Sequence, residues 1–374
     1  MTINISSSVL LNCMQLVNRV IAPNNIMPIL DNALFKVEDS KLTIIGTNLE
    51  NTIITTKEIE TTGPNFSIAL PAKLITETLR SFPEQNIEIE INEENMEVII
   101  KSSTGKYNLI GLKGDGYPEN IDLNQEMRHL IIPTNQLFTG VSNTIISTSV
   151  DARRPAMTGI FIDMQEDKLI FAATDAHKLT KNTFSNIKTD DPCSFIMPKK
   201  TALLIKSILS NNDTKEVDVS FNEMNIIIKT DEFTMISKQI EGKYPNYNAV
   251  IPKDNPYELI IDREILNSAI RRLMVYANPA TCLIKMSVSN NTIELRAQDI
   301  DTSRFGMETM TCQYNGDDMM IGFRATQVAD VLSNIDSQNV RIKLGDSSRA
   351  AIFIPNEIKE GEDLLHLVMP MLIK

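Results

Sequence analysis

An internal repeat of about 125 residues runs through the whole chain of 374 residues and limits the folds it can adopt. One helix candidate occurs three times, at residues 66–82, 194–210 and 319–335. In the second copy Pro198 suits the first turn of a helix, where a missing N–H breaks no hydrogen bond. The basic and apolar residues of that copy fall on opposite arcs of a helix, so one face packs and the other is positively charged. A repeat of this length predicts three similar domains.

Each copy also contains two segments in which apolar and polar residues alternate, a pattern typical of half-buried antiparallel strands. The first segments, each a hairpin with a polar turn, cover residues 35–45, 160–171 and 284–295. The second segments cover residues 87–101, 217–229 and 340–355. The helix candidates cover residues 7–22, 71–82, 133–149, 198–211, 261–277 and 323–336. These patterns predict an α+β fold in which each domain has two halves, each with one helix and antiparallel strands.

Polar, turn-rich stretches separate the copies near residues 122–125 and 252–256. We therefore expect three domains, at residues 1–124, 125–252 and 253–374. No apolar run approaches the roughly 18 residues of a membrane span, and the N-terminus is polar, so we expect a cytoplasmic protein without a membrane partner. The four cysteines lie far apart without metal-ligand spacing, which favours free thiols in a reducing compartment: Cys13, Cys193, Cys282 and Cys312.

The charge of the chain is unevenly distributed. The formal net charge is −12 at pH 7, which taken alone argues against a nucleic-acid partner. The six helix candidates, however, together carry a formal charge of +5, so strands and loops carry −17. If the helices share one surface, that surface is basic and the rest of the molecule repels polyanions.

Three motifs give the repeat a known counterpart: TDAHKL at residues 174–179, EGKYPNY at residues 241–247 and LVMPML at residues 367–372. With the three copies in register, they resemble the bacterial sliding clamp family, the beta subunit of DNA polymerase III. The resemblance spans the whole chain. It implies three repeated clamp domains, with antiparallel sheets outside and two helices per domain inside. It further implies a head-to-tail homodimer that closes into a ring around duplex DNA and raises the processivity of a polymerase without catalysis or a cofactor.

The resemblance also implies a groove between the second and third domains that binds short hydrophobic peptide motifs of polymerases and clamp-loader subunits. Methionine and leucine side chains suit such a groove because they can repack around different partners. Ala176, Lys178 and Ala249 replace a usual glycine, a usual arginine and an often basic residue of the family. The groove residues expected from the motifs are Met157, Thr174, Ala176, His177, Lys178, Leu179, Pro245, Val250, Ala350, Leu367, Met369, Pro370 and Met371.

Basic residues on or just after the helix candidates are expected to face DNA. Lysine and arginine contact phosphates without regard to sequence, which suits a protein that moves along DNA, and no base-reading motif is present. The expected DNA-facing residues are Arg19, Lys73, Arg80, Arg153, Arg154, Lys199, Lys200, Lys206, Arg271, Arg272 and Arg324. At the subunit interface, the resemblance implies that Tyr107 and Leu109 of one chain meet Val275 and Tyr276 of the partner chain.

Two functions of other classes stay open at this point. Asp299, Asp301, Asp317 and Asp318 would be the metal ligands of a metal-dependent nucleic-acid enzyme, although Asp299 aligns with turn residues of the other copies. Little else favours catalysis, because the chain has only three histidines and no phosphate-binding loop or nucleophile motif. A peptide-binding adaptor would share the groove but would not need basic helices. LVMPML alone is also compatible with a plain terminal edge strand.

Overall fold

The computed structural model describes residues 1–22, 27–119, 126–185, 187–210, 214–357 and 359–373. It consists of two compact units. Unit 1 contains Met1–Asn135 and Leu204–Gln239, and unit 2 contains Gln136–Leu203 and Ile240–Lys374. Throughout the described residues the named strands pair only antiparallel, as the alternating sequence pattern predicts.

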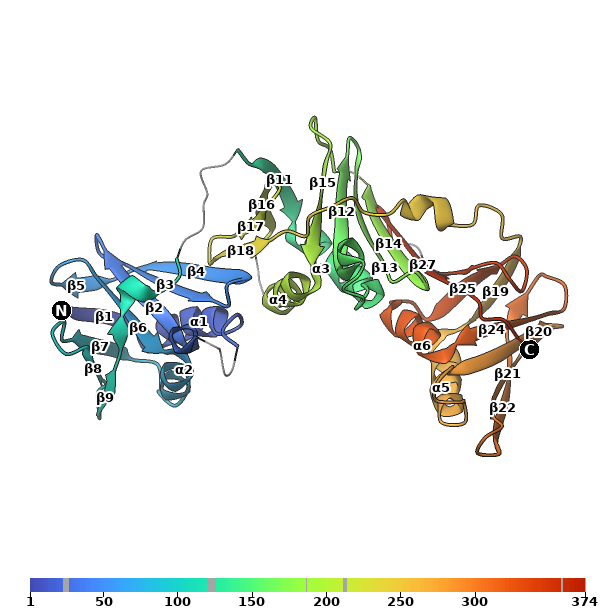
Figure 1. The fold of residues 1–374 in the computed structure, drawn as a ribbon, viewed down its shortest axis with the longest axis horizontal. Coiled ribbons are helices and arrows are strands. Elements are labelled where there is room, and N and C mark those ends of the chain that lie inside the picture. Colours follow the sequence, from blue (N-terminus) through green and yellow to red (C-terminus); the bar gives the residue numbers. More distant parts are fainter. Residues whose placement is uncertain (23–26, 120–125, 186, 211–213, 358, 374) are drawn as a thin grey trace. The chain divides into compact units, whose positions relative to one another are not determined.

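Unit 1 contains two sheets and two neighbouring helices, α1 (Ser7–Val17) and α2 (Ala72–Arg80) (Figure 1). The smaller sheet consists, in spatial order, of β5 (Glu60–Thr62), β1 (Thr2–Ser6), β7 (Asn86–Ile91), β8 (Glu97–Lys101) and β9 (Lys106–Ile110). The larger sheet consists of β10 (Leu112–Lys113), β6 (Phe66–Pro71), β2 (Asn32–Glu38), β3 (Lys41–Thr47), β4 (Asn51–Glu58), β18 (Thr234–Lys238), β17 (Asn225–Lys229), β16 (Glu216–Phe221) and β11 (Arg128–Pro133).

Unit 2 has the same plan, with helices α5 (Arg263–Met274) and α6 (Ala325–Asn334) lying against each other. Its larger sheet consists of β15 (Cys193–Pro198), β12 (Gly159–Gln165), β13 (Lys168–Thr174), β14 (Lys178–Ser185), β27 (Glu362–Val368), β26 (Ala351–Pro355), β25 (Asn339–Leu344), β19 (Tyr257–Asp262) and β23 (Gln313–Tyr314). Its smaller sheet consists of β22 (Arg304–Thr311), β21 (Thr292–Asp299), β20 (Leu283–Ser289) and β24 (Met319–Arg324).

Two further helices, α3 (Thr134–Thr144) and α4 (Lys199–Leu209), occupy the segments in which the division between the units falls. All six helix candidates are therefore confirmed, although each helix is shorter than its candidate segment. After α3, for example, residues 145–147 tighten into a 3-10 turn, η3 (Ile145–Ser147), instead of continuing the helix. The remaining 3-10 turns are η1 (Pro28–Asp31), η2 (Gly114–Gly116), η4 (Pro155–Thr158) and η5 (Tyr247–Val250).

Local sequence explains where these elements begin and turn. The Asp262 carboxylate accepts a hydrogen bond from the backbone N–H of Ile265 at 2.9 Å and so caps the start of α5. Asn290 and Asn291 both have positive φ, 46° and 58°, which is the geometry of a tight two-residue hairpin turn. The predicted α+β class and the hairpins are confirmed.

The large sheets join strands from successive copies of the repeat. In unit 1, β4 of the first copy pairs with β18 of the second. In unit 2, β14 of the second copy pairs with β27 of the third over seven residue pairs. The interpretation of LVMPML as a terminal edge strand is wrong, because Leu367 and Val368 end β27, which lies between β14 and β26. The boundary expected at residue 124 lies outside the described residues, and the division into three domains stays a prediction at this level.

Each helix buries the apolar face that the sequence predicts. In unit 2, α5 and α6 cover one core with the buried side chains of Leu266, Leu273, Val328 and Leu332. Burying an aliphatic side chain of this size stabilises the fold by roughly 1.5–3 kcal/mol, so the packed face, not helix propensity, holds such short helices in place. Among the described helices, none has both the length and the apolar character needed to cross a membrane.

Candidate functional site

A groove with a volume of about 530 Å³ lies in unit 2, beside the junction of β14 and β27. Eleven of the thirteen expected groove residues line it, from Met157 to Met369 in the chain. The other two, Pro370 and Met371, are not among its lining residues. Met371 instead donates its backbone N–H to the carbonyl oxygen of Gly322 on β24, at 2.8 Å. The lining residues are Arg154, Met157, Thr174, Ala176, His177, Lys178, Leu179, Pro245, Asn246, Tyr247, Val250, Pro252, Arg349, Ala350, Leu367 and Met369.

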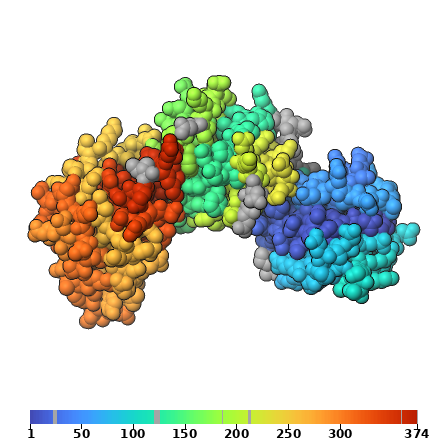
Figure 2. Space-filling view, turned by 180° about the vertical axis from the view of Figure 1, so that it is seen from behind, coloured from blue at the N-terminus to red at the C-terminus, as the bar shows by residue number. Residues whose placement is uncertain are grey.

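A tight turn between β13 and β14 forms one side of the groove. The Asp175 carboxylate accepts hydrogen bonds from the backbone N–H groups of His177 and Lys178, at 2.9 and 2.8 Å. Ala176, between them, has a φ of 76°. The backbone N–H of Met369 donates to the carbonyl oxygen of His177 at 2.8 Å, so the turn and the end of the chain fix each other. Figure 2 shows the C-terminal residues of unit 2, in red, against the green surface of its earlier strands.

The floor of the groove is apolar and fully packed. Leu179 and Leu367 are buried with Tyr244 and Tyr247 in one cluster. The Tyr244 hydroxyl accepts a hydrogen bond from the backbone N–H of Thr174 at 3.0 Å, and burial raises the pKa of Tyr244. Burial also raises the pKa of Tyr247 to about 12. Both phenols therefore stay neutral at physiological pH, and the floor presents an uncharged surface to a hydrophobic ligand.

Exposed apolar side chains mark the rim of the groove. Val250 and Met369 are both exposed, although each belongs to a groove otherwise built on buried residues. Sequence reasoning missed Asn246, Tyr247, Pro252 and Arg349, and it assigned Arg154 to DNA. Asn246 and Tyr247 end the EGKYPNY motif, which was the available signal for them.

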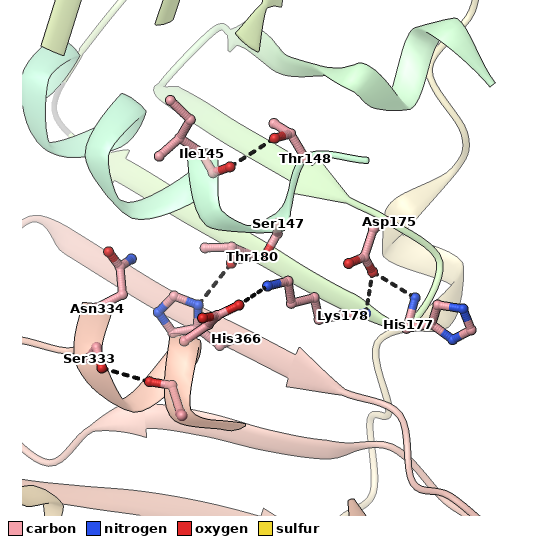
Figure 3. A network of polar contacts seen from close by, with 12 residues as sticks. Ile145, Ser147, Thr148, Asp175, His177, Lys178, Thr180, Ser333, Asn334 and His366 are labelled. Atoms are coloured by element: carbon pink, nitrogen blue, oxygen red, sulfur yellow. Dashed lines mark hydrogen bonds and ion pairs between the residues drawn. The ribbon is translucent and has the colours of Figure 1, made fainter. Parts of the chain in front are cut away.

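A network of polar side chains lies behind the groove, shown in Figure 3. The buried Lys178 ammonium contacts an Asp330 carboxylate oxygen on α6 at 2.7 Å. On the paired strands β14 and β27, the His366 Nδ1 and the Thr180 hydroxyl are hydrogen-bonded at 2.8 Å, and the Thr180 hydroxyl contacts the Ser147 hydroxyl at 2.6 Å. Burial, helped by the charge of Lys178, lowers the pKa of His366 to about 3. His366 is fully buried, so it stabilises the junction and cannot reach a substrate.

The expected DNA-facing residues are mostly exposed, and Lys199 and Lys206 are half-buried. Several already have partners in the fold. Arg153 forms a two-point ion pair with Asp151, at 2.9 and 3.0 Å. Arg272 forms another with Glu308, at 2.8 and 2.6 Å. Their contact with DNA stays a prediction.

The expected interface residues lie at the ends of the two small sheets. Tyr107 and Leu109 are on β9, the last strand of the smaller sheet of unit 1. Val275 and Tyr276 directly follow α5, and both are exposed. Sequence reasoning missed Phe305 and Met307, exposed on β22 at the end of the smaller sheet of unit 2, and Ile110 on β9.

Asp299 and Asp317, two of the four aspartates considered as metal ligands, accept hydrogen bonds within the fold. Asp299 accepts hydrogen bonds from Thr302 and Asn278, which together hold the pKa of its carboxyl below the usual range. Asp317 accepts a hydrogen bond from the Tyr257 hydroxyl at 2.8 Å. Within the residues that the structure describes, no three histidine, cysteine, aspartate or glutamate side chains are grouped to hold a metal ion.

Comparisons with known proteins agree with this architecture. Family models described as DNA polymerase III beta subunit match the chain in three parts: the N-terminal domain at residues 1–122, the central domain at residues 131–246 and the C-terminal domain at residues 248–372. The beta sliding clamp of Pseudomonas aeruginosa is 26% identical over 99% of this chain and 100% of its own length. A crystal structure of that organism's DNA polymerase III subunit beta has a TM-score of 0.92 at 26% identity, with both chains fully covered. Another, of the Pseudomonas aeruginosa sliding clamp bound to griselimycin, has a TM-score of 0.91, also at 26% identity and with full coverage of both chains.

Proposed function

Since this chain belongs to the DNA polymerase III beta-subunit family and is a sliding clamp, we propose that two identical chains close head to tail into a ring around duplex DNA. The ring would tether DNA polymerases and clamp-loader subunits through the groove in unit 2, and it would catalyse no reaction itself. A ring holds its polymer by topology, so sequence-independent contacts from basic helices suffice. The same proposal includes the cytoplasmic location expected from the sequence.

The observation that supports a ring is a missing third junction. The first and second copies join where β4 pairs with β18, and the second and third copies join where β14 pairs with β27. The equivalent strands for one more junction are β22 of the third copy and β9 of the first. Within the described residues these strands end their sheets, and exposed edges of this kind seek a partner. A second copy of the chain supplies both missing partners, which is the condition for a closed head-to-tail ring.

The side chains on these two edges suit burial in an interface. Tyr107 and Ile110 on β9 are exposed, as are Phe305 and Met307 on β22. Tyr276 lies beside β22, because a Cβ atom added at Gly306 would come within 3.2 Å of its ring. Aromatic residues and methionine are enriched in protein interfaces, whereas isolated edge strands usually avoid them.

Solution mass tests the dimer. We expect light scattering to give twice the chain mass of 41.9 kDa for the native protein. Ile110→Asp should shift it to the monomer, because the new carboxylate would be buried unpaired. Ile131→Asp is the matched control, since Ile131 is also an exposed isoleucine on a strand that ends a sheet. A native monomer at micromolar concentration would contradict the proposal.

Retention on DNA tests the topology. Clamps loaded on a nicked circular plasmid should stay bound, and cutting the plasmid should release them because rings slide off free ends. Equal residence times on circular and linear DNA would contradict a ring. Magnesium-dependent cleavage of DNA by the purified protein would instead support the metal-dependent enzyme, which the family comparison does not favour.

A further inference from the structure

A second cavity, of about 460 Å³, lies in unit 2 at the other end of the β14–β27 junction from the groove. The groove lies at the end where Lys178 pairs with Val368, and this cavity lies at the end where Phe184 pairs with Glu362. Six residue steps of about 3.3 Å separate these pairs, roughly 20 Å along the strand. The cavity and the groove share no lining residue, so a short ligand in one does not occupy the other.

One wall of the cavity is apolar. It consists of Phe138 on α3, Ile354 and Pro355 at the end of β26, and Leu364 on β27. The first three of these side chains are only half-buried, so each has surface left for a ligand to cover. The cavity volume lies within the range of roughly 300–1,000 Å³ that is typical of ligand pockets. An apolar group placed against this wall would be removed from water, which favours binding.

The rest of the charged lining is mostly acidic. It contains one ammonium group and four carboxylates: Lys359, Asp336, Glu357, Glu362 and Asp363. The lining therefore has a formal excess of three negative charges. The ammonium group is already paired with Asp336 at 2.9 Å. Among the described residues, no lysine, arginine or histidine nitrogen lies within 4 Å of the other three carboxylates.

Two helix ends add to this negative potential. The last part of α3 lines the cavity with Asn143, and α6 reaches it with its last residue, Asn334. The Asn334 side-chain amide donates to the backbone carbonyl of Asn143 at 2.8 Å, which holds the two helix ends together. Neither helix has a basic residue in its last turn. Because the last carbonyl groups of a helix carry partial negative charge, this site favours a cation.

The matching cavity of unit 1 has the opposite charge. It has a volume of about 360 Å³ and lies beside α1 and β4. Positions at the same distance from the helix start line both cavities: Gln15 and Leu16 on α1, Ser142 and Asn143 on α3. The charged side chains that line the unit 1 cavity give it a formal excess of one positive charge: Arg19, Lys57 and Glu232. The repeat therefore provides a cavity at both junctions, and the acidic lining is specific to the one in unit 2.

We propose that the acidic cavity of unit 2 binds a short segment of a partner protein in which an arginine or lysine stands next to an apolar side chain. The apolar side chain would pack against Phe138 and Leu364, and the cation would lie among the three carboxylates that have no cation of their own. The proposal goes beyond the ring and the groove, because it concerns a surface that neither of them uses.

Other ligands fit this cavity less well. Phosphates of DNA would be repelled by the excess negative charge. Among the described residues, no three potential metal ligands are grouped to hold a metal ion. A small organic cation such as spermidine would use the carboxylates and leave the apolar wall uncovered.

Peptide binding to the intact protein tests the proposal. The probes are fluorescein-labelled synthetic peptides with one leucine and phenylalanine core, flanked by either arginines or glutamines, and the readout is fluorescence anisotropy. The arginine peptide should bind about three- to tenfold more tightly than the glutamine peptide at low salt, from several exposed charge contacts. The difference should shrink as salt is raised.

Two charge reversals in one stretch of chain assign this preference to the cavity. Asp363 and Glu360 are both exposed, but only Asp363 lines the cavity. Asp363→Lys and Glu360→Lys change the net charge of the protein equally, so both weaken a general attraction of cationic peptides to the same extent. Asp363→Lys should abolish the preference for arginine, and Glu360→Lys should leave it within about twofold of the native value. Glu357→Lys, a second reversal within the lining, should act like Asp363→Lys and gives the answer if that variant does not fold.

Three results would overturn the proposal. Equal affinities of the arginine and glutamine peptides at low salt would show that the cavity does not select cationic segments. A preference that survives Asp363→Lys and Glu357→Lys, or that Glu360→Lys removes equally well, would place the attraction outside the cavity. Displacement of the arginine peptide by an equal concentration of spermidine would assign the cavity to small cations. None of these results affects the proposed ring, because solution mass and retention on DNA are measured without the peptides.

Discussion

The turn at Asn48–Asn51 in unit 1 and the turn at Asp175–Lys178 in unit 2 have the same backbone and different side chains. The Asn48 side-chain oxygen accepts hydrogen bonds from the N–H groups of Glu50 and Asn51, at 3.0 and 2.8 Å. Asp175 makes the equivalent pair of bonds at 2.9 and 2.8 Å. The second residue has positive φ in both turns, 71° at Leu49 and 76° at Ala176. Each turn leads into the strand that joins two copies of the repeat.

The side chains at these matching positions differ in size and charge. Leu49, 49% exposed, stands where unit 2 has the small Ala176, which lines the groove. Asn51 stands where unit 2 has the buried, ion-paired Lys178. The repeat thus preserves the backbone of a junction, while the side chains at matching positions of the two turns differ.

A third difference lies inside the paired strands. In unit 1 the buried neighbours Ile53 and Met235 face each other across β4 and β18. In unit 2 the equivalent positions hold Thr180 and His366, which are hydrogen-bonded at 2.8 Å. Unit 2 has therefore exchanged an apolar contact for polar groups that must stay paired or neutral to remain buried.

Removing Asp330 should produce the largest effect. Asp330→Ala would leave the buried Lys178 ammonium without its partner and should lower the free energy of unfolding by about 2 kcal/mol. Breaking fully buried pairs costs more, but Asp330 itself is half exposed and the pair is partly screened. Urea unfolding measures the change.

The same substitution in a Lys178→Met background is the control. Methionine has a similar length and no charge, as at the neutral Asn51 position of unit 1, so Asp330→Ala should then cost less than about 0.5 kcal/mol. An equal loss in both backgrounds would show that the ion pair does not distinguish the two junctions.

Acid should weaken the junction of unit 2 through His366. Its pKa is about 3 in the folded protein, below its ordinary value of 6.5, so the unfolded chain binds more protons between these values. Stability is therefore fully present above pH 6.5 and falls by about 1.4 kcal/mol for each pH unit below it. Unfolding in urea between pH 6.5 and 5 measures the slope before most carboxylates titrate. Lys178 and Asp330 are the charged groups in this network.

A variant that copies unit 1 into unit 2 is the control for this slope. Thr180→Ile combined with His366→Met reproduces the Ile53 and Met235 pair and removes the titrating group. The stability of this variant should change little between pH 6.5 and 5. A slope that persists would assign the acid sensitivity to another group.

The sequence predicted more of the fold than of its junctions. The repeat and the alternating strands predicted all six helices and the antiparallel hairpins, because burial on one face leaves a periodic pattern. Which strands join across copies left no such pattern, since β14 and β27 alternate in the same way whichever neighbour they have. The free edge at β22 was missed for the same reason, although Phe305 and Met307 are exposed there.

The groove shows the same limit at the level of single residues. Motifs predicted residues that are adjacent in the chain, such as Ala176 to Leu179, and these do line one groove. Motif adjacency also suggested Met371, but its backbone N–H donates to the carbonyl oxygen of Gly322 on β24, and it is not among the residues that line the groove. Arg154 was assigned to DNA from its charge and its position just after a helix candidate, and it also lines the groove. Residue type predicts chemistry, but three-dimensional packing decides which ligand that chemistry meets.

Filling the groove from its turn should reduce peptide binding without unfolding the protein. Unit 1 already has a leucine, Leu49, at the matching turn position with a φ of 71°. The turn in unit 2, where Ala176 has a φ of 76°, should therefore accept the substitution Ala176→Leu. The leucine would occupy part of the groove and should lower the affinity of the protein for a hydrophobic peptide by about tenfold, as measured by fluorescence anisotropy. Leu49→Ala, the reverse change in unit 1, should not alter the affinity. Unchanged binding by Ala176→Leu would show that this turn does not limit the groove.

Relieving the backbone of the same turn should give the smallest effect. A non-glycine residue at a φ of 76° is strained by its Cβ, and glycine is not, so Ala176→Gly should raise the free energy of unfolding. The expected gain is about 0.5 kcal/mol, because the added freedom of the unfolded chain offsets part of the relief. Leu49→Gly should gain less or lose stability, since it relieves the same strain but removes a half-exposed leucine. If urea unfolding showed Ala176→Gly to be the less stable of the two variants, the turns would share their hydrogen bonds but not their strain.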